Sequence, residues 1–496
     1  MSDTRALLNR IAEFRQRIEA MPKLVPMAEL VSPPLPVSPT AVDHVKQRVE
    51  AGSRTQAILE SSLRQLENAS SVHEPMPLTN RARRLLIDAQ GLVARLKALA
   101  DDPLLAGPPP NSEGMVPEAD VHAVHYRETA AMTESLVRFA LSFPDSASEQ
   151  ARLCEGLEGM LDAAHRRFSL LAHSLERRRL EVTRVDVMAR FLAALCHGIG
   201  PLDPSPVIEL THTLIAEEPG QPLRLLHELP EAVQVYLGGP AYPAPARFIA
   251  SHAINCAKVM VRLVRHDPEW RMRPHEPVLA ALLHDVGMLK IEPSVLAHAG
   301  PLSQEKKREI EKHAHVGAEL IADRIPSLAS LMEPIANHHE RSDGTGYPMG
   351  LTEVKQSPLA RLLAMVDVYV ALLSPRAHRG ASDPRSVLTD VLLLADRGHL
   401  DRFAAEKFLT LGFYPPGTVV EMADGSTGVV MASRDPRLAL SLAGRPMLAL
   451  LADSQGRPLA TPRYVDLAER DAGTVVRALD PFERMTRLGR HYPEWV

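Results

Sequence analysis

Histidine and aspartate side chains interrupt or follow several apolar helical stretches in the second half of the chain. Nine of the 21 histidines lie between positions 252 and 339. The polar residues set within or directly after apolar runs are His252, His284, Asp285, His338, His339 and Asp367. Burying an ionised carboxylate beside an imidazole is costly unless a positive charge compensates for it, and a metal ion does so well. We therefore expect these helices to pack around one polar centre.

The residue types in this group indicate a divalent metal site. Neutral imidazoles and carboxylates suit borderline or hard ions such as iron, manganese, zinc or cobalt. Adjacent side chains on a helix diverge by about 100°, so the pairs His284-Asp285 and His338-His339 can each serve a site that holds two ions. Two neighbouring ions would activate a hydroxide and hold both oxygens of an in-line phosphoryl displacement.

Length and composition limit the classes of protein that fit. A chain of 496 residues is expected to hold two or three domains. The net charge of −5 does not favour DNA as a partner, because binding phosphates needs a clustered basic surface. The three cysteines have no paired spacing, which favours a reducing compartment and argues against a disulfide scaffold or a cysteine-zinc site. No membrane span or signal peptide is apparent, so we expect a cytoplasmic protein without a membrane partner.

The first half of the chain is predicted to be a helical region over residues 1–245. Prolines bunch near 33–39 and 103–110, where they would break helices because proline lacks the backbone donor. Apolar residues recur with helical spacing in 42–66, 85–99, 119–143 and 147–196, and Gly198 follows as a C-cap.

This helical region has two open interpretations. A scaffold or interaction role, which could support a homodimer or signalling partners, is favoured over ligand sensing. His122, His125 and the run Arg177–Arg179 are expected on solvated helix faces rather than in a site.

The tail predicts a small β module over residues 413–475, followed by a tail over 476–496. Two β-branched runs flank Asp424-Gly425, which is typical of a hairpin. Two further strand candidates, 446–452 and 458–467, surround Gly456. The chain is therefore expected to be mainly α, with a β module after the helical core at 246–412.

Two motifs in this core resemble a known family. His284-Asp285-Val-Gly287 resembles the signature of HD-domain phosphohydrolases, and the stretch 338–351, His-His-Glu-Arg-Ser-Asp-Gly-Thr-Gly-Tyr-Pro-Met-Gly-Leu, resembles the longer signature of the HD-GYP subfamily. The resemblance covers about residues 246–412. It implies an all-α HD-type helix bundle and a metal-dependent phosphodiesterase that hydrolyses cyclic di-GMP to linear pGpG, or onward to GMP.

The resemblance also implies a set of site residues. The family places a ligand four residues before Gly317, which selects His313 and leaves His315 as a neighbour or surface residue. Among the ligands, His284 and Asp285 would also be the catalytic residues. The implied metal ligands are His252, His284, Asp285, His313, His338, His339 and Asp367.

Substrate contacts are expected beyond the ligands. Gly344 and Gly346 mark a loop that needs unusual backbone geometry, with Gly346 and Tyr347 against the substrate. The alternative for this loop is a purely structural turn. Arg376 and Arg379 match a family stretch and could hold the phosphodiester, since guanidinium recognises phosphate well. Exposed arginines without a special role are the alternative.

Three positions depart from the family. Phe248 stands where the family often has a glutamate, so two ions are expected rather than three, with iron or manganese favoured. Met288 stands where a lysine is usual, and Lys290 could replace it only if the backbone is irregular there. A lysine would neutralise the phosphate or protonate the leaving oxygen. Val370 replaces a second aspartate without removing a ligand.

Three functions therefore compete. The leading one is hydrolysis of cyclic di-GMP. A catalytically weak or inactive module that binds metal and nucleotide is favoured by Met288. Hydrolysis of another phosphorylated nucleotide is the third.

Overall fold

A computed structural model describes most of the chain beyond residue 78. The described residues are 79–100, 102, 105, 116–144, 146–217, 223, 225, 246–265, 267–292, 295, 303–374, 383–433, 444–469, 472–479, 481–488 and 491–492. The helical stripes predicted in 42–66, the proline cluster at 33–39, most of 103–110, and both Arg376 and Arg379 lie outside them. Within the described residues the protein is mainly helical with a small β module near the C-terminus, as predicted, and this module is a five-stranded sheet.

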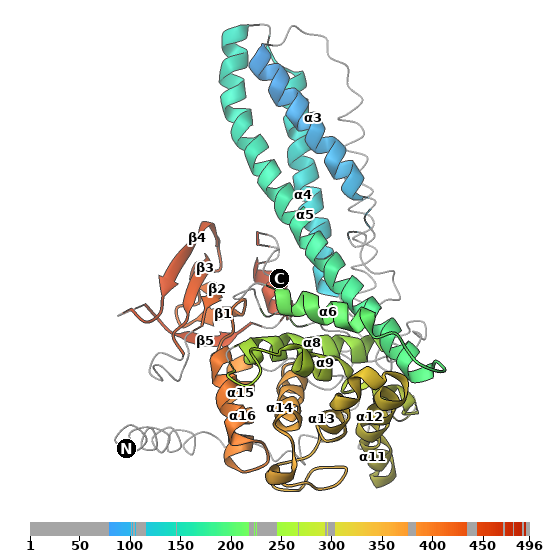
Figure 1. The fold of residues 1–496 in the computed structure, drawn as a ribbon. Helices are drawn as coiled ribbons and strands as arrows, with labels where there is room; N and C mark the ends of the chain where they lie inside the picture. The colour runs from blue at the N-terminus through green and yellow to red at the C-terminus, as the bar shows by residue number, and fades with distance from the viewer. Residues whose placement is uncertain are drawn as a thin grey trace.

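Three long helices form a bundle at one end of the molecule (Figure 1). They are α3 (Asn80–Ala100), α4 (Val116–Leu141) and α5 (Ala147–His197). Leucines at helical spacing on α3 are buried against the other two helices. At 1.5 Å per residue, α5 is about 75 Å long. It therefore continues past the bundle, reaching α6 (Ser205–Ala216) and the second half of the chain.

The bundle interior corrects one prediction. His122, His125 and Arg178 are buried, at most 6% exposed, instead of lying on solvated faces. His122 shares a hydrogen bond with the hydroxyl of Ser174 across the α4–α5 contact, Nε2 to Oγ 2.8 Å. Arg179 in contrast is about half exposed and pairs with Asp102, as a surface arginine would. Other helices pack against both sides of α4 and α5, so these polar side chains are buried. The spacing of apolar residues in the sequence does not show that.

Helices also make up the second half, around one large apolar core. They are α8 (Ala246–Arg265), α9 (His275–Leu283), η1 (Val286–Lys290), α11 (Gln304–Glu311), α12 (His313–Arg324), η2 (Pro326–Leu331), α13 (Met332–Ala336), η3 (Glu353–Lys355), α14 (Pro358–Leu373), α15 (Pro384–Asp396), α16 (Arg402–Phe408) and η4 (Leu409–Leu411). Helices α8 and α14 are apolar on most of their surface and lie at the centre of this core. Side-chain oxygens of Ser357, Asp383 and Asp401 cap the first turns of α14, α15 and α16.

An antiparallel sheet follows the helices. Its strands are β1 (Val419–Met422), β2 (Thr427–Ala432), β3 (Met447–Ala452), β4 (Pro458–Asp466) and β5 (Val475–Ala478), in the order β4-β3-β2-β1-β5. The predicted hairpin is confirmed, with Val420 opposite Gly428 and Gly425 at φ +88° in the turn. Both further strand predictions are confirmed as β3 and β4.

Two short elements were not predicted: β5, and α17 (Pro481–Leu488) after it. The backbone N–H of Ala478 in β5 donates to Asp383 Oδ2 at 2.7 Å, which ties the sheet to the start of α15. The division at 245/246, 412/413 and 475/476 stays a prediction. None of the described helices is both long and apolar enough to span a membrane.

Candidate metal centre

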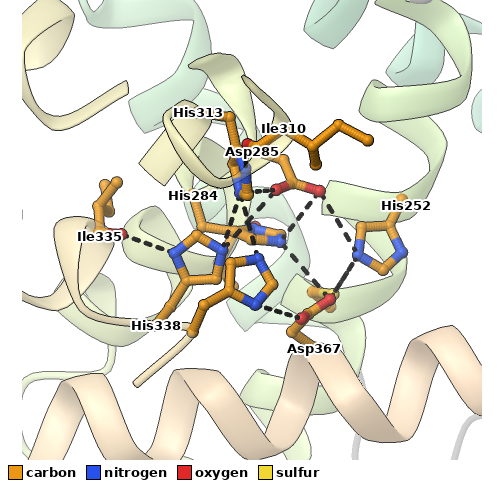
Figure 2. Close-up of polar contacts among 11 residues, drawn as sticks. His252, His284, Asp285, Ile310, His313, Ile335, His338 and Asp367 are labelled. Atoms are coloured by element: carbon orange, nitrogen blue, oxygen red, sulfur yellow. Dashed lines mark hydrogen bonds and ion pairs between the residues drawn. The ribbon is translucent and has the colours of Figure 1, made fainter. Parts of the chain in front are cut away.

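Five separate elements bring the seven predicted ligands together (Figure 2). His252 comes from α8 and Asp367 from α14, while His284 and Asp285 lie where α9 ends and η1 begins. His313 is the first residue of α12, and His338 and His339 follow α13 in a turn. The side chains of His252, His284, Asp285, His313, His338 and Asp367 point toward one another in Figure 2.

Two glycines allow the ligand-bearing elements to approach closely. A Cβ on Gly287 would lie 2.0 Å from the backbone oxygen of His313, which is far too close. A Cβ on Gly317 would lie 3.2 Å from the backbone nitrogen of Gly287. The two backbones therefore pack directly against each other. This contact fixes the His284-Asp285 pair beside His313.

Three histidines are oriented by their own backbone. The Nδ1 atoms of His284, His313 and His338 lie 2.9, 2.6 and 2.6 Å from backbone oxygens three residues earlier, those of Ala281, Ile310 and Ile335. A carbonyl only accepts, so each Nδ1 donates its proton there, and each Nε2 is turned toward the cluster, where the neutral imidazole can bind a metal ion. Metal-bound histidines are held in this way.

The Nε2 atoms of three histidines lie within hydrogen-bond distance of one another. His313 Nε2 lies 3.5 Å from His338 Nε2 and 3.2 Å from His339 Nε2. His284 Nε2 is fully buried and has no hydrogen-bond partner within the described structure. Converging lone pairs in a buried space are the arrangement that a cation would stabilise.

The two carboxylates each face both sides of the cluster. Asp285 Oδ1 lies 3.2 Å from His313 Nε2, and Oδ2 lies 3.8 Å from His252 Nε2. Asp367 Oδ1 lies 3.0 Å from His252 Nε2, and Oδ2 lies 3.9 Å from His339 Nδ1. Each carboxylate could therefore contact two ions, one through each oxygen.

Burial keeps two of the imidazoles neutral. It lowers the pKa of His284 to about 4. Burial, together with the charge of His338, also lowers the pKa of His339 well below its usual range. For His313, burial is outweighed by Asp285, and the pKa is raised. A bound cation would displace that proton, because metal and proton compete for the same lone pair.

The carboxylates stay ionised despite their surroundings. Burial alone would raise the pKa of both Asp285 and Asp367. The neighbouring His284 imidazole and the hydrogen bonds with His313 and His338 hold the pKa of Asp285 well below its usual range. The hydrogen bond with His252 does the same for Asp367. Carboxylate oxygens beside imidazole nitrogens form the donor set that borderline divalent ions prefer once a cation has displaced the imidazole protons.

The donor atoms divide into two candidate metal clusters. Within each, the donor atoms lie within 4.8 Å of one another; group A contains His252, Cys256, His284 and Asp367, and group B contains Asp285, His313, His338 and His339. Cys256 was missed by the sequence reasoning. It lies four residues after His252 on α8, and no sequence signal distinguished it from an ordinary core residue.

The glycine-rich loop is held against group B by a buried carboxylate. Glu340, 1% exposed, accepts the backbone N–H groups of Met349 at 2.7 Å and Leu351 at 2.8 Å. Tyr347 stacks on His339 with ring centroids 4.7 Å apart and an interplanar angle of 25°. Glu340 was named in the motif but not predicted to have this role.

The two glycines of this loop serve different purposes. Gly344 has φ +79°, as the sequence suggested. Gly346 does not have a positive φ. Instead, a Cβ there would lie 2.4 Å from the backbone nitrogen of Arg341 and 2.5 Å from the His339 oxygen. Gly346 thus allows the loop to lie directly on the segment that carries the paired histidines.

The remaining predicted positions fall outside the cluster. The side chain of His315 is 65% exposed and pairs with Glu319 on the surface, whereas His313 is buried in the cluster. Met288 and Phe248 pack against the apolar core, and Val370 is buried within it. Lys290 is exposed, at the end of η1. Burial raises the pKa of Cys196 in α5, and the charge of Lys290 partly offsets this.

Comparison with known proteins gives a family for this part of the chain. Residues 241–403 match the family model described as HD domain. This chain contains an HD domain. A cyclic di-GMP phosphodiesterase of Pseudomonas aeruginosa is 32% identical over 185 residues, which are 36% of this chain and 43% of that protein. The predicted family is therefore confirmed.

Two further relatives align with the HD domain region. The cyclic di-GMP phosphodiesterase response regulator RpfG of Xanthomonas campestris is 37% identical over 25% of this chain and 32% of that protein. A 3′3′-cGAMP-specific phosphodiesterase of Vibrio cholerae is 34% identical over 21% of this chain and 22% of that protein. The chain spans less than half the length of each of these relatives.

Proposed function

We propose that the HD domain is a metal-dependent phosphodiesterase that hydrolyses cyclic di-GMP to pGpG, GMP or both. One observation carries the proposal: seven side chains from five elements converge with their lone pairs and carboxylate oxygens facing a common centre. The names of the relatives support the choice of a cyclic dinucleotide as substrate.

The donor set fits two divalent ions, one in each group. Imidazole nitrogens and carboxylate oxygens favour iron or manganese among the ions considered. When bound, such ions would supply Lewis acidity for the phosphodiester oxygens and for the attacking water. The seven predicted residues would be the ligands, with Cys256 as an additional donor in group A.

The protein's own side chains would orient the reaction. Asp285 faces both groups through its two oxygens and has His284 beside it, with Nε2 3.5 Å from Oδ2. We assign the catalytic role to this pair. Burial raises the pKa of Tyr347. Its phenol would therefore stay neutral and could donate its O–H to a phosphate oxygen. The close-packed backbone at Gly346 would present Tyr347 to the substrate, and Arg376 and Arg379 stay predictions.

A binding module is the second candidate, and Met288 favours it. Its side chain packs against the core, and Lys290 is exposed at the end of η1, two residues further along the chain. Without a lysine at this point, protonation of the leaving oxygen would be slower. Another cyclic dinucleotide is the third candidate, which the 3′3′-cGAMP-specific relatives support.

The helical half would serve as a scaffold or interaction surface. Its bundle is joined to the HD domain through α5, so signalling partners or a second copy binding there could act on the domain. We propose a cytoplasmic location, in keeping with three buried cysteines that are all free thiols.

Metal loading and turnover together test this function. The full chain is purified anaerobically with iron or manganese, and its metal content and cyclic di-GMP hydrolysis are measured beside a variant with His284→Ala and Asp285→Ala. We expect about two ions per chain, turnover by the wild type and none by the variant. Tight nucleotide binding without product would support the binding module, and a count near one ion would contradict the two-ion site.

A further inference from the structure

Group A contains a donor outside the predicted ligand set. Cys256 is fully buried on α8, one helical turn after His252. Residues four apart share one helix face, and Cys256 Sγ lies 3.6 Å from His252 Nε2. The sulfur, this nitrogen, His284 Nε2 and an Asp367 oxygen all lie within 4.8 Å of one another.

The distances match donors around a shared ion. Metal–sulfur bonds of about 2.3 Å and metal–nitrogen bonds of about 2.0 Å in a tetrahedral site place S and N roughly 3.5 Å apart. The measured separation is 3.6 Å. A second observation points to the same ion, since His284 Nε2 is completely buried, belongs to this group and has no hydrogen-bond partner within the described structure.

The donors on α8 lie on one side of His252. Phe248, four residues before His252, cannot bind a metal and packs against the core. Cys256, four residues after His252, faces the donor group instead.

The other cysteines show what an ordinary buried thiol looks like in this chain. Cys154 lies in the core of the helical bundle and Cys196 near the end of α5. Neither belongs to a group of metal-binding side chains among the described residues. Cys256 differs from both in facing two imidazoles and a carboxylate.

We propose that Cys256 is a thiolate ligand of the ion held by His252, His284 and Asp367. The proposal rests on the metal centre proposed above and adds a soft donor to one half of it. As the sulfur–metal bond forms, the thiol proton passes to solvent. Thiolate favours zinc, iron or cobalt over manganese, so group A would select a softer ion than group B, whose donors are only nitrogen and oxygen.

Cobalt is a spectroscopic probe of this bond. The metal-free full chain is loaded anaerobically with Co²⁺, and its near-ultraviolet and visible spectra are recorded. We expect a thiolate-to-cobalt charge-transfer band that is lost in Cys256→Ser. A variant with Cys154→Ser and Cys196→Ser, which keeps Cys256 alone, should retain the band. Cys256→Ser should also weaken metal binding by about tenfold or more, as changes around metal sites typically do.

The outcomes separate this proposal from the one on which it rests. A chain that takes up no cobalt would refute the metal centre itself. Uptake with ligand-field bands but no charge-transfer band would overturn the role of Cys256 and leave the metal centre standing. If Cys256→Ser does not fold, X-ray absorption on zinc-loaded wild-type protein decides the matter. A sulfur neighbour at about 2.3 Å from zinc is then expected, and only nitrogen and oxygen neighbours would contradict it.

Discussion

Replacing Glu340 with glutamine is expected to loosen the glycine-rich loop without emptying the metal centre. The buried carboxylate accepts two backbone N–H groups, from Met349 and Leu351. Hydrogen bonds to a charged group contribute about 1.5–3 kcal/mol each. Glutamine keeps one acceptor oxygen but turns an NH₂ donor toward the second N–H. At least one bond is lost, which costs about 2–3 kcal/mol.

Hydrogen exchange measures this loosening directly. A loss of 2–3 kcal/mol corresponds to about 30- to 150-fold faster exchange of the two amides if local opening governs it. Exchange is followed by mass spectrometry in peptides that cover 343–352. Metal content should stay at the wild-type value because Glu340 belongs to neither donor group.

A matched carboxylate provides the control. Glu353 lies close in the sequence, but its side chain is 43% exposed and pairs with Arg361 at 3.1 Å. Such a pair contributes less than about 1 kcal/mol, so Glu353→Gln should leave exchange of the loop unchanged. Unaltered exchange in Glu340→Gln, or equal acceleration in both variants, would refute the role of Glu340.

Three further outcomes follow from the site. Met288→Lys should raise kcat for cyclic di-GMP by about tenfold or more, and an unchanged rate in a folded variant would refute the lysine argument. In the metal-free chain, folded His284 takes up a proton only near its lowered pKa of about 4, whereas the unfolded chain does so near 6.5. Lowering the pH from 7 to 5 should therefore cost about 2 kcal/mol of unfolding free energy from this residue. Urea unfolding at pH 7 and pH 5 measures this loss. It should be about 2 kcal/mol smaller in His284→Gln than in the wild type, and an equal loss in both proteins would contradict the role of His284. Gly346→Ala should raise KM while leaving metal content unchanged, because its Cβ has no room beside the Arg341 backbone; a wild-type KM would count against the loop's role in binding.

Much of the fold was predictable because its signals are local. The hairpin around Asp424-Gly425 follows from turn chemistry between β-branched runs, and β1 and β2 pair there. β5 has only four residues, and two adjacent valines are too weak a pattern to predict a strand. The inward placement of His122 and Arg178 depends on helices packing from two sides. The sequence of a single helix does not show which of its faces other helices will cover.

Six of the predicted ligands were visible because they lie within or directly after apolar runs that must be buried. His313 follows a charged helix, and only the family resemblance selected it. Cys256 gave no such signal, since a thiol among Ala and Ile reads as an apolar residue. The position of Cys256 beside Asp367 depends on the packing of α8 against α14, which the sequence does not give. The roles of Gly287 and Gly317 likewise depend on a contact between two backbones, which the sequence marks as conformational freedom and nothing more.

Hydrolysis by wild-type protein beside two neighbouring histidine variants tests the central claim most directly. His313 faces the metal centre, whereas His315, two residues later, is exposed and pairs with Glu319. Anaerobic, metal-loaded proteins are incubated with cyclic di-GMP, and pGpG and GMP are quantified by mass spectrometry. We predict product from the wild type and from His315→Ala, and none from His313→Ala or from wild type stripped of metal by a chelator. Product from His313→Ala at the wild-type rate, or none from any metal-loaded protein, would contradict a metal-dependent phosphodiesterase at this site.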